Sequence, residues 1–140
     1  MSVGKALPFL EARVVDNDDK YLPPGEVGEL ICRGPNVMEG YYGNPEGTRQ
    51  AIRNGWLYTG DLARVDEEGF FYIVDRKKEM IISGGENIYP REIEETLIKH
   101  PAIADVAVVG IPDQYWGESV KAFVALREGK MISEQEVIDF

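Results

Sequence analysis

The sequence predicts an α+β fold in two parts, a β-rich part over residues 1–75 and a small α+β domain over residues 80–140. Three observations support this prediction. Short apolar segments separated by turn residues fill the first part. The second part has the order strand–strand–helix–strand–strand–helix, which is typical of a sheet packed by helices on one face. Residues 75–79 form a charged break between two apolar strands, as at many domain boundaries.

The elements of the first part follow from its turn residues. Residues 10–15 and 27–33 are predicted strands, because each is rich in apolar residues and is flanked by Asp, Asn, Pro or Gly. Asn44 and Pro45 predict a short helix that runs to about Ile52, with the asparagine as cap and the proline at the first helical position.

A hairpin is predicted next. Residues 62–65 and 70–74 are apolar and flank the turn Asp66-Glu67-Glu68-Gly69, in which Gly69 can adopt a positive φ.

The second part contains four predicted strands, at residues 80–82, 87–89, 103–111 and 119–126. The pair Gly84-Gly85 predicts a tight turn after the first of them. The capping box at residues 133–136, a serine followed three residues later by a glutamate, begins a last helix.

Another helix lies between these strands. Pro90 opens it, and its apolar residues recur on one face: Ile93, Leu97 and Ile98. Glu95 and Lys99 are four residues apart, which predicts an ion pair on the helix surface. Pro101 stops the helix.

The composition excludes several classes of protein. The net charge is -10, from 15 basic and 25 acidic residues, which argues against a nucleic-acid partner. A single cysteine, Cys32, excludes an internal disulfide framework and reads as a small buried hydrophobe. No apolar run approaches the ~20 residues needed to cross a bilayer, and no secretory leader is visible. These features predict a cytoplasmic protein without a transmembrane segment.

Asp61 and Arg76 are the leading candidates for ligand binding. A carboxylate can accept hydrogen bonds from both hydroxyls of a ribose, and a guanidinium can bind a ribose oxygen or a phosphate. From the residues alone, the favoured interpretation of Asp61 is a cap of a turn or of the next element, and Arg76 is explained as a surface ion pair with Asp75 or Glu79.

The candidate functional residues of the second part can also be explained by structural roles that need no ligand. Gly84 and Gly85 suit a hairpin turn, and they do not belong to a phosphate-binding loop of the Gly-x-x-x-x-Gly-Lys type. Trp116, in a loop between two strands, could stack on a base, cover a channel or seal the core. His100 has no catalytic partner at a telling spacing and is interpreted as a helix cap.

The run Asp75–Glu94 (DRKKEMIISGGENIYPREIE), together with Tyr58-Thr59-Gly60-Asp61, resembles adenylate-forming enzymes, particularly the acyl-CoA synthetases. Gly28-Glu29-Leu30 and Gly40-Tyr41-Tyr42 also resemble that family. Its members use ATP to join a carboxylic acid to AMP, and then pass the acyl group to the thiol of coenzyme A. The resemblance covers essentially the whole chain, from Val3 to Phe140.

The resemblance implies a fold and roles for particular residues. Residues 1–75 would be the β-rich, partial-barrel end of the large AMP-binding domain, residues 76–79 the hinge, and residues 80–140 the small mobile domain. The matching residues would bind the AMP ribose (Asp61, Arg76), act as the hinge pivot (Lys78) and line the coenzyme A channel (Gly84, Gly85, Trp116). The implied cofactors are ATP, Mg²⁺ and coenzyme A, and no metal-binding residue is expected in this chain.

Two family elements are missing from the sequence. The loop that wraps the ATP triphosphate, together with the acid-binding pocket of the large domain, is expected before Met1. The lysine that orients the substrate carboxylate is expected beyond Phe140, since Lys121 and Lys130 lack the family's surrounding sequence. The chain therefore reads as a truncated fragment with no catalytic residue of its own, and we expect it to be inactive alone.

The sequence favours a fatty acid as the substrate, because Asn87–Glu94 is similar to medium- and long-chain members. Two alternatives stay open: an adenylation domain that loads a carrier protein, and a small interaction module without enzymatic activity.

Overall fold

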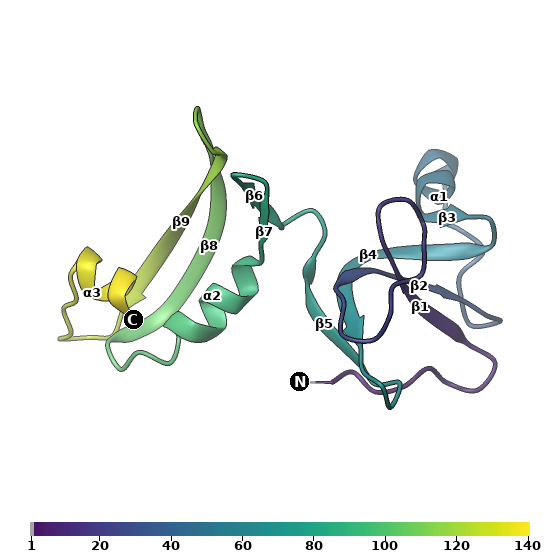
Figure 1. The fold of residues 1–140 in the computed structure, drawn as a ribbon, viewed down its shortest axis with the longest axis horizontal. Coiled ribbons are helices and arrows are strands. Elements are labelled where there is room, and N and C mark those ends of the chain that lie inside the picture. Colours follow the sequence, from purple (N-terminus) through teal and green to yellow (C-terminus); the bar gives the residue numbers. More distant parts are fainter. Residues whose placement is uncertain (1) are drawn as a thin grey trace. The chain divides into compact units, whose positions relative to one another are not determined.

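The computed structural model describes residues 2–140. The chain folds into two compact units that divide after Lys78, and Figure 1 shows the order of their elements along the chain. Each unit has its own antiparallel sheet, as expected for an α+β protein. The helices of residues 2–140 are all too short and too polar to cross a bilayer.

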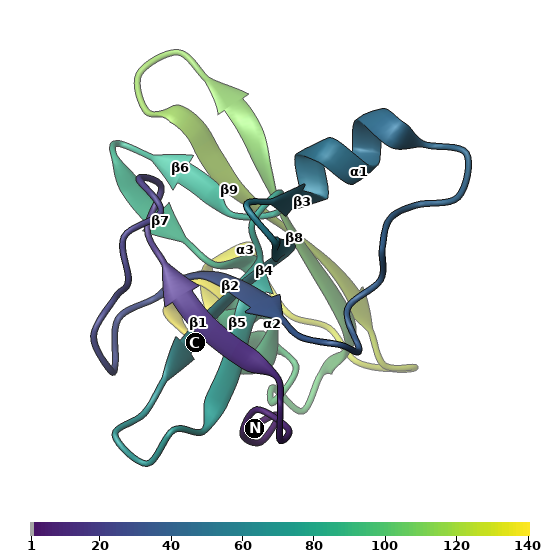
Figure 2. The same ribbon diagram turned by 90° about the vertical axis from the view of Figure 1, so that its right-hand side faces the viewer.

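The first unit is built on a 5-stranded sheet in which β1, β2, β4 and β3 are neighbours in that order and β5 pairs with β4. The strands curl around one another like part of a barrel (Figure 2). Their bounds are β1 Glu11–Val15, β2 Gly28–Arg33, β3 Ile52–Arg53, β4 Trp56–Val65 and β5 Phe71–Arg76.

Both faces of this sheet are packed. Val14 belongs to one buried cluster, with Ala63 and Phe71. The next residue, Val15, belongs to another, with Ile31 and Trp56. Successive side chains of a strand point to opposite faces, so β1 contributes to two small cores at once. This arrangement makes the sheet a rigid support for the residues at the ends of its strands.

Helix α1 (Pro45–Ala51) begins as predicted, with the Asn44 side chain accepting the Gly47 N–H at 2.8 Å. The predicted end at about Ile52 is one residue too late. Ile52 has an extended backbone and enters β3, where it pairs with Leu57 of β4. The cross-strand pairing therefore outcompetes one more residue of helix.

The hairpin formed by β4 and β5 confirms the predicted turn at residues 66–69. Asp66 donates its backbone N–H to the Phe70 carbonyl at 3.0 Å, and Gly69 has a φ of 84°. Strand β4 is longer than predicted, since it begins at Trp56 rather than Leu62.

The second unit has the predicted order of strands and helices and a 4-stranded sheet in which β7, β6, β9 and β8 are neighbours. Helices α2 and α3 lie over the same face, because both line one groove with Val120, Ala122 and Val124 of β9. The bounds are β6 Ile81–Ser83, β7 Glu86–Ile88, α2 Pro90–Leu97, β8 Ile103–Asp113, β9 Gly117–Leu126 and α3 Glu134–Asp139.

Of two predictions about the helices of this unit, one is confirmed and one is wrong. The capping box at Ser133 and Glu136 is present at the start of α3, as predicted. The predicted pair of Glu95 with Lys99 is wrong: Glu95 pairs with Arg91, with Nε and Oε1 3.0 Å apart. Helix α2 ends at Leu97, so Lys99 lies beyond the helical register that would bring it above Glu95.

Helix α2 is tied to the neighbouring strand by a side chain. Glu94 Oε1 accepts the backbone N–H of Val108 in β8 at 2.8 Å. One turn further along the helix, Leu97 is buried. The helix is therefore held on the sheet by both a polar contact and an apolar one.

Candidate functional site

Asp61 and Arg76 face each other at the end of the β4–β5 ladder. Their Cα atoms are paired in register, and Arg76 Nε lies 3.0 Å from Asp61 Oδ1. The Asp61 side chain is 28% exposed and the Arg76 side chain 58% exposed. Both groups can therefore bond to each other and still reach a ligand. The structure brings together the two residues that the sequence singled out for the same sugar.

The backbone before Asp61 is shaped by its neighbours. Gly60 has a φ of 74°, which glycine adopts without strain. The Thr59 hydroxyl donates to the Leu30 carbonyl at 2.8 Å and accepts the Asp61 N–H at 3.1 Å. These contacts anchor the Tyr58–Asp61 segment to strand β2 and fix the direction in which the carboxylate leaves the strand.

Glu29 is a second acidic residue at this place, and sequence reasoning assigned it no role. Its carboxylate is buried and accepts the Gly60 N–H at 3.2 Å. It also forms an ion pair with Lys77, with Nζ and Oε2 2.9 Å apart. The available signal was a glutamate next to the apolar run at residues 30–32 of a predicted strand, where a charge needs a partner.

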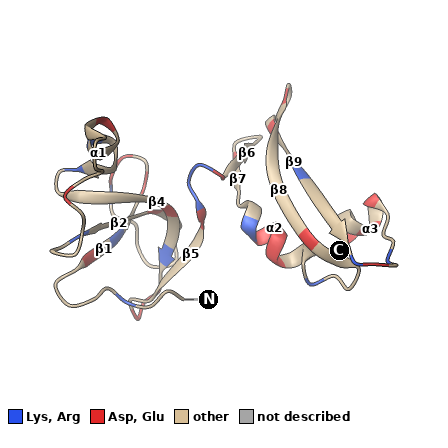
Figure 3. Cartoon of the chain, turned by 180° about the vertical axis from the view of Figure 1, so that it is seen from behind, with Lys and Arg blue, Asp and Glu red and all other residues tan. Residues whose placement is uncertain are grey.

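A shallow pocket lies beside the Asp61–Arg76 pair. Gly60, Arg76, Lys77 and Lys78 line it, and basic residues follow the end of β5 in Figure 3. In a chain of net charge -10, this local concentration of cations would favour an anionic ligand. Lys78 is thus part of the same pocket wall as Arg76.

Gly84 and Gly85 form the turn of the β6–β7 hairpin. Their φ angles are 59° and 89°, as in the turns that suit the twist of a two-residue hairpin. A β-carbon on Gly84 would lie 2.7 Å from Cε3 of Trp116, whereas nothing lies within 4 Å of the corresponding position on Gly85. Only Gly85 therefore presents an open surface on that side.

Trp116 sits at the tip of the β8–β9 hairpin and does not seal the core, since it is 54% exposed. Its carbonyl accepts the Gly84 N–H at 2.9 Å, and its ring packs edge-on against Tyr115 at 4.6 Å between centroids. Asp113 Oδ1 accepts the N–H groups of Trp116 and Tyr115, each at 2.8 Å. These two N–H groups, that of Trp116 first, lower the pKa of Asp113 below its usual range.

Two other side chains that could be reactive, His100 and Cys32, lie in surroundings that give them structural roles. His100 follows α2, and its Nδ1 accepts the Ala102 N–H at 3.2 Å. Cys32 is half-buried, and burial raises the pKa of its thiol, which keeps the nucleophilic thiolate scarce. Within residues 2–140, no three His, Cys, Asp or Glu side chains gather as a metal site would require.

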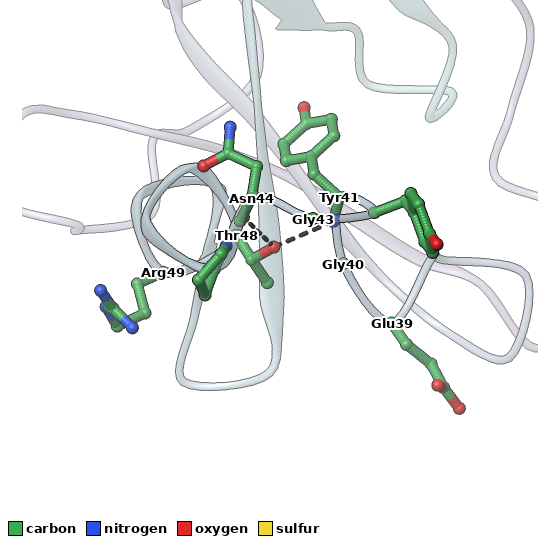
Figure 4. A pocket seen from close by; sticks show the side chains of 9 residues that line it. Glu39, Gly40, Tyr41, Gly43, Asn44, Thr48 and Arg49 are labelled. Carbon is green, nitrogen blue, oxygen red and sulfur yellow. Dashed lines mark hydrogen bonds between the residues drawn. The ribbon is translucent and has the colours of Figure 1, made fainter.

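A separate pocket lies beside α1 and contains none of these candidate residues (Figure 4). Within it, the Thr48 hydroxyl donates to the Asn44 carbonyl and accepts the Tyr41 N–H, each at 2.9 Å. A β-carbon on Gly40 would come within 2.7 Å of the Thr48 methyl group. The backbone of Gly40 and Tyr41 is therefore fixed to the helix through the Thr48 side chain.

Comparison with known proteins agrees with this arrangement. The model of the family described as AMP-binding enzyme matches residues 1–42, and that of the AMP-binding enzyme C-terminal domain matches residues 92–140. A long-chain-fatty-acid–CoA ligase of Bacillus subtilis strain 168 is 50% identical over 140 residues, covering 99% of this chain and 25% of that protein.

Solved structures give the same result. MatB from Rhodopseudomonas palustris with ATP bound has a TM-score of 0.92 and 41% identity, covering 99% of this chain and 28% of its own. The o-succinylbenzoate CoA synthetase (MenE) of Bacillus subtilis, in complex with its acyl-adenylate intermediate, has a TM-score of 0.91 and 43% identity with the same coverage.

The chain spans about a quarter of the length of the curated relatives it matches. Matches at both ends of the sequence, high identity across its whole length and the shared fold lead to one conclusion: the chain belongs to the AMP-binding enzyme superfamily of adenylate-forming ligases.

Proposed function

We propose that this chain supplies the ribose-binding pair, the hinge and part of the coenzyme A channel of an ATP-dependent acid–CoA ligase. The complete enzyme would activate a carboxylic acid as its acyl-adenylate and transfer the acyl group to coenzyme A. The observation that carries the proposal is the Asp61–Arg76 pair, joined across two strands and exposed beside a basic pocket.

The two side chains fit a ribose by their chemistry. A carboxylate accepts hydrogen bonds only, so Asp61 can receive both hydroxyl protons of the sugar. Arg76 orients that carboxylate, and its remaining N–H groups can donate to a ribose oxygen or to the phosphate. ATP, bound with Mg²⁺, would supply the adenylyl group, and coenzyme A the thiol that accepts the acyl group.

The division of the chain supports the proposed hinge. Residues 1–75 would belong to the large AMP-binding domain, residues 76–79 to the hinge, and residues 80–140 to the small mobile domain. The first compact unit ends at Lys78, the residue proposed as the pivot. Lysine suits that position, because its long side chain can reach solvent in more than one orientation of the backbone.

The second unit would contribute to the coenzyme A channel. Gly85 leaves open space where a side chain would otherwise stand, so an extended pantetheine arm could approach the backbone closely. Trp116, half-exposed and packed on Gly84, would form the wall next to it. We therefore assign Gly85 to the channel surface and Trp116 to the wall beside it. Gly84 packs against the indole and supports that wall.

A fatty acid is the proposed substrate. The support is the name of the Bacillus subtilis relative, a long-chain-fatty-acid–CoA ligase, together with the similarity of Asn87–Glu94 to such enzymes. Thioester formation by the complete protein that carries this chain, compared between a long-chain fatty acid and 2-succinylbenzoate, would test the choice. Equal or better turnover of the succinylbenzoate would contradict it.

A segment exchange tests the ligase proposal itself. The homologous segment of the Bacillus subtilis relative would be replaced by these 140 residues, and ATP–pyrophosphate exchange and thioester formation would be measured separately. We expect both steps to be retained. A folded hybrid that performs neither step would contradict the proposal.

A further inference from the structure

We infer that Glu29 is a positioning residue for the Asp61–Arg76 pair, and that its buried carboxylate sets the spacing of the two strands that carry the pair. This inference rests on the proposed function, because it deepens the role of the same site. It assigns Glu29 no contact with the ligand.

The contacts of Glu29 lie on one side of the pair, at the two residues next to it along the chain. Oε1 accepts the N–H of Gly60, the residue before Asp61, at 3.2 Å. Oε2 accepts a hydrogen bond from Nζ of Lys77, the residue after Arg76, at 2.9 Å. The Lys77 backbone N–H in turn donates to the Gly60 carbonyl at 2.8 Å. The three residues form a closed ring of contacts just beyond the Asp61–Arg76 pair.

The backbone explains why a side chain is needed there. The register between β2 and β4 shifts between Glu29 and Ile31, where Gly60 takes its positive φ. At such a shift the regular ladder of N–H and C=O groups is interrupted, and an unpaired N–H must find another acceptor. The Glu29 carboxylate is that acceptor for Gly60.

Because position 29 is buried, placing a carboxylate there costs free energy of folding. The Glu29 side chain is 8% exposed, whereas that of Lys77 is 40% exposed. A buried carboxylate is stabilising only when it is paired and hydrogen-bonded, and an apolar residue of similar size would often serve stability as well or better. Among residues 2–140, the buried acidic residues are Glu29 and Asp75, and both contact the residues around this pair. We take their location to mean that these two carboxylates fix the geometry of the Asp61–Arg76 pair rather than add stability.

The first measurement is amide hydrogen exchange on the 140-residue chain, read residue by residue by NMR. Glu29→Met keeps the length of the side chain and removes both acceptors. We expect exchange at Gly60 and Lys77 to accelerate by about tenfold or more, as loss of a charge-assisted hydrogen bond predicts. Exchange at the buried Ala63 should not change. Equal rates at Gly60 in both proteins would overturn the inference.

Two further variants serve as controls. Glu29→Gln retains an acceptor for the Gly60 N–H and loses the ion pair, so it should restore protection at Gly60. Glu11→Gln removes an exposed carboxylate that pairs with Arg33 in the same sheet, and it should leave Gly60 unchanged. Faster exchange at Gly60 in Glu11→Gln would mean that any weakening of the sheet has this effect, and would also count against a specific role.

The second measurement compares binding of AMP with that of 2′,3′-dideoxy-AMP to the same chain. Because Glu29 acts through Asp61, Glu29→Met should weaken the binding of AMP by about tenfold. It should leave the binding of the dideoxy analogue unchanged. Equal losses for both nucleotides would reduce Glu29 to a general structural role. If the unsubstituted chain fails to prefer AMP, the ribose-binding pair itself is wrong, while amide exchange still decides whether Glu29 fixes its geometry.

Discussion

The Trp116 indole occupies the space that a β-carbon on Gly84 would need, with only 2.7 Å between that position and Cε3. The carbonyl of Trp116 also accepts the Gly84 N–H. One residue at the tip of the β8–β9 hairpin thus fixes the turn of the β6–β7 hairpin twice, once by its ring and once by its backbone. The two hairpins otherwise share a short ladder, since Ser83 and Gly117 are the paired residues.

Gly84→Ala should therefore destabilise the second unit. A positive φ costs alanine about 1 kcal/mol, and the clash with the indole adds about 1–3 kcal/mol. Gly85→Ala is the matched control, because it has the same type of backbone strain without a neighbour to displace. In chemical denaturation, Gly84→Ala should have a lower free energy of unfolding than Gly85→Ala. Adding Trp116→Ala to Gly84→Ala should recover part of the difference, and no recovery would contradict the contact.

Removing Arg76 should affect ligand binding far more than folding. The Asp61–Arg76 pair is substantially exposed, and such pairs contribute about 0–1 kcal/mol to stability. In the hybrid ligase, Arg76→Ala should raise the KM for ATP by about tenfold or more, as expected for loss of a charge-assisted hydrogen bond. Arg49→Ala removes an exposed arginine paired with Glu46 on α1 and should leave that KM unchanged. A similar KM in both variants would argue against the ribose assignment.

Acid should loosen the Trp116 turn through Asp113. The folded-state pKa of Asp113 is lowered by the N–H groups of Trp116 and Tyr115. The stabilisation is therefore complete above the pKa of the unfolded chain and is lost as pH falls through the lower, folded value. With Trp56→Phe as background, Trp116 fluorescence should change over that acidic range. Asp113→Asn keeps an acceptor but cannot titrate, so the transition should disappear; a persistent transition would implicate another group.

The chain alone should not form an acyl-adenylate. Adenylation requires a positioned carboxylate, a triphosphate and Mg²⁺ together, and our proposal assigns to these residues only the ribose-binding pair, the hinge and part of the coenzyme A channel. Incubation with ATP, Mg²⁺ and a fatty acid should release no pyrophosphate above the rate without protein. The Bacillus subtilis relative is the positive control, and pyrophosphate release by this chain would contradict the prediction.

The sequence predicted elements where local signals were strong. The Asn44-Pro45 start of α1, the glycine turns and the capping box at Ser133 depend on neighbouring residues, and they are present. The end of α1 was misplaced because Ile52 pairs with Leu57 across the Asn54-Gly55 turn, a short hairpin that the helix prediction did not include. The start of β4 was misplaced because Leu57 and Tyr58 pair with β2, which lies much earlier in the chain. Local propensity cannot report which partner a strand will meet.

The candidate site was predictable to a similar degree. Asp61 and Arg76 stood out because each lies in a recognisable run, and the antiparallel register brings them together. Glu29 was not assigned, since its role depends on a shift of register with a strand far along the chain. The contact of Trp116 with Gly84 likewise joins two hairpins whose relative placement no short-range pattern encodes.

The contact of Glu94 with β8 has a consequence for solubility. Strand β8 lies at the margin of its sheet, where unpaired N–H groups could recruit a strand from another molecule. Glu94 accepts the N–H of Val108, and Asp105 accepts that of Val106. A second chain would have to displace two carboxylates to extend the sheet there, so the margin resists the self-association and fibril growth that an open strand of this length invites.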